Sequence, residues 1–277
     1  MYQIKAEILK KVYRQRNPWS YKGNYGKLLV IAGGISFGSE VLVSLAAQRS
    51  GCDYIKVFGP KGSKEFGFLY PQIIFLEYER DRFDKKAIES ISELMNWSKV
   101  IVVGNSIGTD KEQEEFVNGL INKYTGKIVI DADGIKVLDK RLLGPNILLT
   151  PNSYEFKLIS GEEPSKDLNT RASQVKSFAN KYNTNVLLKG HYDIFSDGRD
   201  VYFNKTNSVY MAKPGTGDVL AGIAASLIAQ GNTIIDSALA SAYINGYAGR
   251  LVSKEKGPAL SPLDIIEKIP VVINKKF

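Results

Sequence analysis

The chain has 277 residues, a length compatible with one large α/β domain or two small ones, and its 44% hydrophobic content is sufficient for a sizeable core. The single cysteine (Cys52) and single histidine (His191) exclude an internal disulfide framework, a Cys/His zinc site and any Ser-His-Asp triad that does not use His191. The net charge of +8 is scattered, which suits nucleotides and phosphates, and nothing resembles a nucleic-acid-binding module.

Short apolar strands alternate with helices along most of the chain. A short amphipathic segment comes first, at 4–12, and a strand hairpin around Asp197-Gly198 joins 192–195 to 201–203. The other strands are expected at 27–32, 54–58, 73–76, 99–103, 127–130, 147–150 and 186–190. The helices are expected at 41–50, 84–96, 110–124, 168–182, 218–230, about 233–253 and 262–268.

This alternation predicts an α/β fold with three layers, α/β/α, in which a mainly parallel central sheet has helices on both faces. No repeat, low-complexity region or linker interrupts the pattern, so we expect one domain over residues 1–277. No apolar run approaches about 18 residues and there is no signal-peptide core. We therefore expect a cytoplasmic protein that does not bind a membrane.

Loops rich in glycine, aspartate and asparagine follow several of the expected strands. Because ligands gather at the carboxyl ends of parallel strands, these loops can converge on one cleft. The first of them has the spacing of a phosphate-binding loop, Gly33-x4-Gly38, but Ser39-Glu40 stands where that motif needs Lys-Ser/Thr, so we reject it. Either the loop and the following helix start border a ligand, or they form a tight strand–helix turn.

The stretch Lys213–Gly222 is the strongest candidate for chemistry. Gly215 and Gly217 precede an apolar helix, with Asp218 expected on its first turn. Glycines let backbone N–H groups approach a ligand, and a helix start is a ready anion site. The alternative is a capped helix without a ligand, which explains Asp218 but not the two glycines and Pro214 before it.

Several of these segments together resemble the ADP/ATP-dependent NAD(P)H-hydrate dehydratases, which have the ribokinase-like fold. The resemblance runs from about residue 22 to 270. It is carried by Lys22–Gly26, Val30–Gly34, Arg49–Gly51, Gly104–Gly108, Asp131–Gly134, Leu149–Pro151 with Glu155, Leu188–Gly190 and Gly215–Gly222. The Gly-x-Gly-Asp element is shared by ribokinase-like kinases, whereas the ordered set, with Leu-Lys-Gly ahead of it, is specific to the dehydratases.

The resemblance implies a lyase of metabolite repair that acts on (6S)-NAD(P)H-hydrate. ADP or ATP would phosphorylate the added hydroxyl, and loss of phosphate would restore NAD(P)H. Asp218 would be the general base, and Gly215, Thr216 and Gly217 would hold the transferring phosphoryl group. By family position, Lys189, Gly190, His191, Tyr192 and Asp193 would bind the nucleotide, and Ser39, Gly108 and Asn152, with Asp218, would line the hydrate pocket.

The resemblance also implies Mg²⁺ beside the phosphates and a homo-oligomer. Asp131 and Glu155 are candidate metal residues. The alternatives are that Asp131 caps its loop, that Glu155 only occupies the first turn of its helix, and that Lys189 and His191 are merely solvated at a strand end. We expect no epimerase domain of the kind that some family members carry.

The sequence departs from the family pattern mainly on the hydrate side of the expected cleft. Ser106 stands in place of glycine, Ser39 in place of alanine and Asn152 in place of histidine, and asparagine cannot titrate as histidine does. The 34–38 loop is also shorter, and Lys213-Pro214 replaces small residues. Two other functions therefore stay open, a small-molecule kinase of the same fold and a non-catalytic nucleotide-binding homologue.

Overall fold

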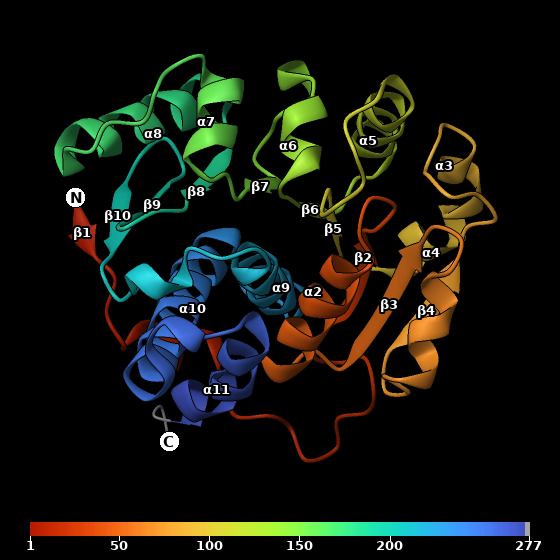
Figure 1. The fold of residues 1–277 in the computed structure, drawn as a ribbon, viewed down its shortest axis with the longest axis horizontal. Helices are drawn as coiled ribbons and strands as arrows, with labels where there is room; N and C mark the ends of the chain where they lie inside the picture. The colour runs from red at the N-terminus through yellow and green to blue at the C-terminus, as the bar shows by residue number, and fades with distance from the viewer. Residues whose placement is uncertain (275–277) are drawn as a thin grey trace.

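The computed structural model describes residues 1–274, in which a ten-stranded sheet lies between two layers of helices (Figure 1). The strand order is β1-β10-β9-β8-β7-β6-β5-β2-β3-β4, and every neighbouring pair from β8 across to β4 is parallel. Strand β9 is antiparallel to both of its neighbours, β8 and β10. The strands are β1 (Tyr2–Gln3), β2 (Lys27–Ile31), β3 (Tyr54–Gly59), β4 (Ile74–Glu77), β5 (Val100–Val103), β6 (Lys127–Ile130), β7 (Ile147–Leu149), β8 (Asn185–Leu188), β9 (Asp193–Ser196) and β10 (Val201–Asn204).

The central strands are mostly apolar because both faces of the sheet are covered. All four residues of β5 are buried. In β2, Leu28 and Val30 belong to one hydrophobic core and Leu29 and Ile31 to the other. Since successive side chains of a strand point to opposite faces, one short run of apolar residues serves both layers.

One helical layer contains helix α9, whose residues from Val219 to Ala229 are all buried. In Figure 1 it lies between α2 and α10. This layer consists of α1 (Ile8–Val12), α2 (Gly38–Arg49), α9 (Thr216–Ala229), α10 (Ile234–Lys256) and α11 (Pro262–Asn274). The opposite layer consists of α3 (Ala87–Ser90), α4 (Ser92–Trp97), α5 (Lys111–Lys123), α6 (Asp133–Val137), α7 (Ser153–Ser160) and α8 (Leu168–Tyr182).

The expected three-layer arrangement with a mainly parallel sheet is confirmed, as are α8 at 168–182 and the hairpin of β9 and β10. The single helix expected at 84–96 is wrong, because the chain breaks at the fully buried Ile91 into α3 and α4. The apolar spacing of Ile88, Ile91 and Met95 fits two short helices as well as one long helix, so periodicity could not show the break.

Two further expectations are corrected at helix and strand starts. The 4–12 segment is helical only in α1, and β1 pairs with β10 at the edge of the sheet, a long-range contact that local periodicity does not encode. Helix α2 begins at Gly38, so Ser39 and Glu40 lie in its first turn. Within residues 1–274, no helix combines the length and the apolar character needed to cross a membrane.

Candidate active site

A cavity of about 870 Å³ opens at the carboxyl ends of the central strands. It brings together segments from β6, β7, β8 and the start of α9. Of the residues predicted from the sequence, the cavity is lined by Asp131, Asn152, Glu155, Lys189, Gly190, His191, Asp193, Gly215, Thr216, Gly217 and Asp218. Ser39, Gly108 and Tyr192 are not among its lining residues.

The start of α9 supplies unpaired backbone donors to this cavity. Gly215 is the N-cap at φ 92° and α9 begins at Thr216, so Gly217 lies inside the first turn rather than before the helix, while Asp218 lies on the first turn as expected. The N–H of Thr216 donates to Lys213 O and that of Val219 to Gly215 O, which leaves the N–H groups of Gly217 and Asp218 for a ligand. The Thr216 hydroxyl donates to Met211 O (2.8 Å) and therefore ties the loop to the helix.

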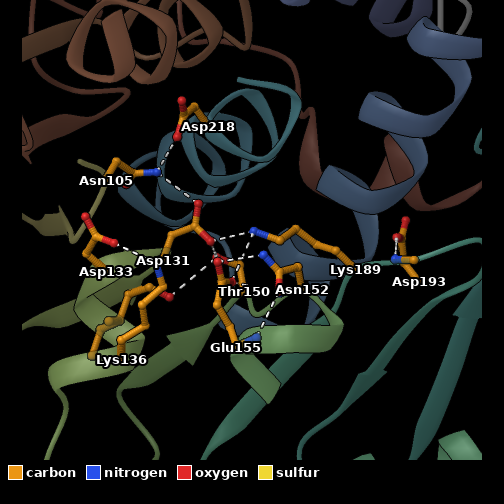
Figure 2. A network of polar contacts seen from close by, with 12 residues as sticks. Asn105, Asp131, Asp133, Lys136, Thr150, Asn152, Glu155, Lys189, Asp193 and Asp218 are labelled. Carbon is orange, nitrogen blue, oxygen red and sulfur yellow. Dashed lines mark hydrogen bonds and ion pairs between the residues drawn. The ribbon is translucent and has the colours of Figure 1, made fainter. Parts of the chain in front are cut away.

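Asp218 accepts a hydrogen bond from the buried Asn105, which follows β5. Nδ2 of Asn105 lies 2.6 Å from Oδ1 of Asp218, and Figure 2 shows this amide between Asp218 and Asp131. Burial, and then the nearby charge of Asp131, raise the pKa of Asp218 to about 6, although hydrogen bonds from Asn105 and Ser39 oppose the shift. A carboxylate with this pKa is ionised at neutral pH and can still accept a proton, as a general base must.

Lys189 neutralises a second buried carboxylate. Its Nζ lies 2.6 Å from Oδ1 of Asp131, whose side chain is 1% exposed, and 4.0 Å from Oε2 of Glu155. Asp131 also accepts hydrogen bonds from Thr150 Oγ1 (2.9 Å) and from Asn105 Nδ2 (2.9 Å). Burial lowers the pKa of Lys189, but the charges of Asp131 and Glu155 outweigh burial and raise it, so the ammonium is charged.

Asn152 and Glu155 form the capping box of α7. The Glu155 N–H donates to Asn152 Oδ1, and Glu155 accepts hydrogen bonds from the Asn152 backbone N–H (2.8 Å) and amide (2.7 Å). Both Glu155 oxygens are therefore engaged, and burial raises the pKa of this carboxyl. With the Lys189 ammonium between Asp131 and Glu155, this pair does not fit a free divalent-cation site. Within residues 1–274, no group of three or more His, Cys, Asp and Glu side chains is arranged to hold a metal.

The loop after β5 approaches the loop after β6 closely because Gly104 has no side chain. Its φ is 121°, and a Cβ on it would lie 2.1 Å from Asp131 O. The same loop ends at Gly108, whose N–H donates to Asp133 Oδ2 (3.0 Å). Close packing of these loops is what places Asn105 beside Asp131.

Two serines meet on the expected hydrate side of the site. Ser39 Oγ lies 2.8 Å from Ser106 Oγ, and the Ser39 side chain also hydrogen-bonds to Asp218. Ser106 adopts a positive φ of 58°, a conformation that glycine adopts more easily. Two residues that depart from the family pattern therefore meet beside the candidate base.

The turn that follows β8 is shaped by buried polar contacts. Asp193, 4% exposed, accepts hydrogen bonds from the Gly190 N–H (3.1 Å) and from Asn204 Nδ2 (3.0 Å), and burial raises its pKa. The ring of Tyr192 packs edge-on against His191 and Phe203. Asp193 and Tyr192 thus hold the turn in place, while Gly190 and His191 face the cavity.

Sequence reasoning missed several cavity residues. Asn105 does not itself line the cavity but bonds to two residues that do, Asp131 and Asp218. It could have been found, because it directly follows a buried strand and Gly104 in one of the loops expected to converge. Asn245 carried no signal, since it lies within the long helix α10 and only the fold turns it toward the cavity. The other lining residues outside the predicted set of site residues are Ala132, Ser153, Tyr154, Asn207, Ser208, Val209, Met211, Ala212, Lys213, Pro214 and Leu220, of which the last three belong to the candidate stretch Lys213–Gly222.

Comparison with known proteins identifies the family. Residues 28–271 match the family model of NAD(P)H-hydrate dehydratase. The chain is 32% identical over 277 residues to an ADP-dependent (S)-NAD(P)H-hydrate dehydratase from Cenarchaeum symbiosum, covering 98% of this chain and 96% of that protein. It spans about half the length of other curated relatives that it matches, which are bifunctional NAD(P)H-hydrate repair enzymes.

Solved structures agree on the fold. A Bacillus subtilis ADP/ATP-dependent NAD(P)H-hydrate dehydratase co-crystallised with ATP and Mg²⁺ superposes with a TM-score of 0.87 at 22% identity, covering 100% of this chain and 99% of that one. A ribokinase-like superfamily protein from Enterococcus faecalis superposes with a TM-score of 0.86 at 21% identity, covering 99% and 96% of the two chains. The fold is therefore ribokinase-like, and the chain belongs to the NAD(P)H-hydrate dehydratase family.

Proposed function

We propose that the protein restores (6S)-NAD(P)H-hydrate to NAD(P)H in a reaction that consumes ADP or ATP. The observation that carries this proposal is the position of Asp218, a carboxylate with a pKa of about 6 in the first turn of α9, beside unpaired amides at the wall of a nucleotide-sized cavity. The family membership, and the activity named for the Cenarchaeum symbiosum relative, support the same reaction.

In this reaction Asp218 removes the proton of the substrate hydroxyl while that oxygen attacks the terminal phosphoryl group. The bond from that phosphorus to the nucleotide breaks, and the shortened nucleotide leaves. The phosphate group then leaves the ring carbon as inorganic phosphate. A proton is lost from the neighbouring ring carbon at the same time, which restores the double bond of the nicotinamide ring. Asp218 needs only hydrogen-bond reach to the hydroxyl.

The N–H groups of Gly217 and Asp218 hold the phosphoryl oxygens on which negative charge accumulates. Lys189 lies next to Gly217, where a Cβ would be 3.1 Å from its Nζ, so the ammonium can meet the same phosphates. Gly190 and His191 line the same cavity and are placed to contact the rest of the nucleotide. The substrate hydroxyl then approaches from the side of Ser39, Ser106 and Gly108.

Mg²⁺ would enter with the nucleotide, held by its phosphates and by water, because magnesium sites use few protein carboxylates. It would neutralise charge on the phosphates. Asp131 and Glu155 serve primarily as the counter-charges of Lys189 in this proposal. We also expect a homo-oligomer, on the family resemblance, and light scattering of the purified protein tests that expectation.

A small-molecule kinase of the same fold is the second candidate. It is favoured by the contact between Ser39 and Ser106, which places two additional hydroxyl groups beside Asp218 on the acceptor side. Such an enzyme would release a phosphorylated alcohol instead of eliminating phosphate.

One assay separates the two functions. The protein is incubated with hydrated NADH or hydrated NADPH and with ADP or ATP, and the absorbance of the reduced nicotinamide and the release of phosphate are followed together. Recovery of the absorbance with equimolar phosphate is the expected result. Nucleotide consumption only with an added alcohol, and none with either hydrate, would assign a kinase.

A further inference from the structure

Within residues 1–274, Asn105 is the one neutral side chain that hydrogen-bonds to both Asp131 and Asp218. It follows β5, is 1% exposed, and its Nδ2 lies 2.6 Å from Asp218 Oδ1 and 2.9 Å from Asp131 Oδ2 (Figure 2). The family resemblance gives this residue no role, and no step of the proposed reaction uses it. Its contacts nevertheless reach both the candidate base and the pair formed by Asp131 and Lys189.

The chemistry of the neighbours fixes the orientation of the Asn105 amide. Carboxylates only accept hydrogen bonds, and an asparagine amide carries two N–H donors on one nitrogen. If the amide were reversed, its carbonyl oxygen would face two carboxylate oxygens in a buried site, which is strongly unfavourable. Both hydrogens of Nδ2 are therefore committed, one to each carboxylate.

The charged groups around Asp218 determine how much the Asn105 amide affects its ionisation. Asp131 faces Asp218 from the loop after β6, Lys189 from the end of β8, and Glu155 lies behind Lys189 on α7. Asp131 disfavours ionisation of Asp218, whereas Asn105, Ser39 and Lys189 favour it. Asn105 is the only one of these groups that bonds to both carboxylates, so its two N–H donors partly offset the repulsion between Asp131 and Asp218.

We propose that Asn105 is a positioning residue for phosphoryl transfer: its amide holds Oδ1 of Asp218, so that Oδ2 takes the proton of the acceptor, and it ties the base to the Asp131–Lys189 pair that meets the phosphates. The proposal rests on the proposed function in taking Asp218 as the general base. It goes beyond that function in assigning how the base is aimed. The class of acceptor, hydrate or other alcohol, does not change the argument.

The test uses a graded pair of variants. Asn105→Leu has nearly the same size and no donor, whereas Asn105→Ser keeps one donor. Asn118→Leu is the matched control, because the Asn118 amide also makes two hydrogen bonds, to Val137 O (3.0 Å) and from the Asp139 N–H (2.8 Å), and it is not among the residues lining the cavity.

Three quantities are measured on the full chain: kcat and KM with ADP, the dissociation constant of ADP, and the pKa of Asp218 from carboxyl ¹³C NMR of the free protein, with Asp218→Asn used for assignment. We expect Asn105→Leu to lower kcat by about tenfold or more, to change the affinity for ADP by less than about twofold, and to raise the pKa of Asp218 by about one unit. Asn105→Ser should fall between wild type and Asn105→Leu, and Asn118→Leu should change none of the three quantities.

The proposal is overturned if Asn105→Leu keeps the wild-type kcat, whether or not the pKa moves, since the aim of the carboxylate would then not matter. It is also overturned if kcat falls equally in Asn118→Leu. If the wild-type protein processes neither a hydrate nor another alcohol, the proposed function is wrong, independently of the role of Asn105. The NMR titration still decides whether Asn105 holds Asp218, and an unchanged pKa in Asn105→Leu would reject that.

Discussion

Nζ of Lys189 lies 2.6 Å from Oδ1 of Asp131 at the inner end of the cavity, and the two side chains are 17% and 1% exposed. Because a buried ammonium must be paired to stay charged, Asp131 keeps a positive charge in place before any nucleotide arrives. The Lys189 ammonium is therefore charged and held in place in the free protein. In the proposed reaction Asp131 would act through Lys189 and Asn105.

Removing either partner of this pair should destabilise the fold, and removing both should not. Lys189→Met leaves Asp131 and Glu155 uncompensated, so we expect a loss of about 3 kcal/mol or more in the free energy of unfolding. Asp131→Asn should have a similar effect, and the double variant should lose much less than the sum. Urea unfolding of the wild type, the two single variants and the double variant measures the coupling between Lys189 and Asp131.

The exposed pair of Lys157 and Glu163 (55% and 67% exposed) is the control, and Lys157→Met should cost less than about 1 kcal/mol. Additive losses at Lys189 and Asp131 would contradict the pairing.

Asp218→Asn should remove the general base without removing the nucleotide site. We expect kcat to fall by about 10²–10⁴-fold, while the dissociation constant of ADP, measured by calorimetry, changes little. Asp264→Asn is the control, because Asp264 pairs with Lys256 at the surface and should not affect the rate. A rate within a factor of a few of wild type would remove Asp218 from the role of base.

The rate should depend on pH through the same carboxylate. Since the pKa of Asp218 is raised to about 6 and the base must be ionised to accept a proton, kcat/KM should fall about tenfold per pH unit below about pH 6. It should level off above that value. A stopped-flow or steady-state profile from pH 4.5 to 8 checks this, and a profile that stays flat down to pH 5 would be inconsistent with the raised pKa.

Asp218 should also make the folded protein less stable at neutral pH. A carboxyl whose pKa is higher in the folded state than its ordinary value of 3.8 binds more protons when folded, so stability falls as pH rises from about 4 to 6. The shift corresponds to about 3 kcal/mol above pH 6. Asp218→Asn should therefore melt at a higher temperature than wild type at pH 8 and at nearly the same temperature at pH 4. Calorimetry at both values measures the difference, and a lower melting temperature at pH 8 would argue against the assigned shift.

The two glycines of the motif should respond differently to substitution. Gly215 has φ 92°, and a Cβ there would lie 2.7 Å from Leu42 Cδ1 and 2.8 Å from Pro262 Cγ, so Gly215→Ala should cost about 1–3 kcal/mol of stability. Gly217 lies within the helix, and its Cβ would lie 3.1 Å from Lys189 Nζ. Gly217→Ala should keep the stability and weaken ADP binding by about tenfold, because the methyl group enters the phosphate position. Thermal melts and ADP titrations of both variants test these two roles. Equal effects of the two substitutions on ADP binding would contradict a specific role of Gly217 at the phosphates.

The sequence by itself determined the layers and the Gly-x-Gly-Asp motif at the beginning of α9, although the helix starts two residues earlier than expected. The apolar strands can be predicted because their residues are buried on both faces of the sheet. Gly-x-Gly-Asp next to an apolar helix is a local pattern, and the chemistry it suggests follows from the unpaired amides at a helix start. The sequence also placed Asp131 and Asn152 in loops that follow strands and Lys189 at the end of a strand, and the resemblance assigned the family that the comparisons confirm.

Only the tertiary structure decided which of these residues touch. Asn105 and Asp218 are 113 positions apart, and they meet because the strand order places β5 under the start of α9. The same packing buries Asp218 and raises its pKa, sets Lys189 between Asp131 and Glu155, and turns Asp193 and Tyr192 into supports of the Gly190 turn. Periodicity and motif spacing describe a chain locally, whereas distances and pKa values depend on groups that the fold brings together from distant parts of the chain.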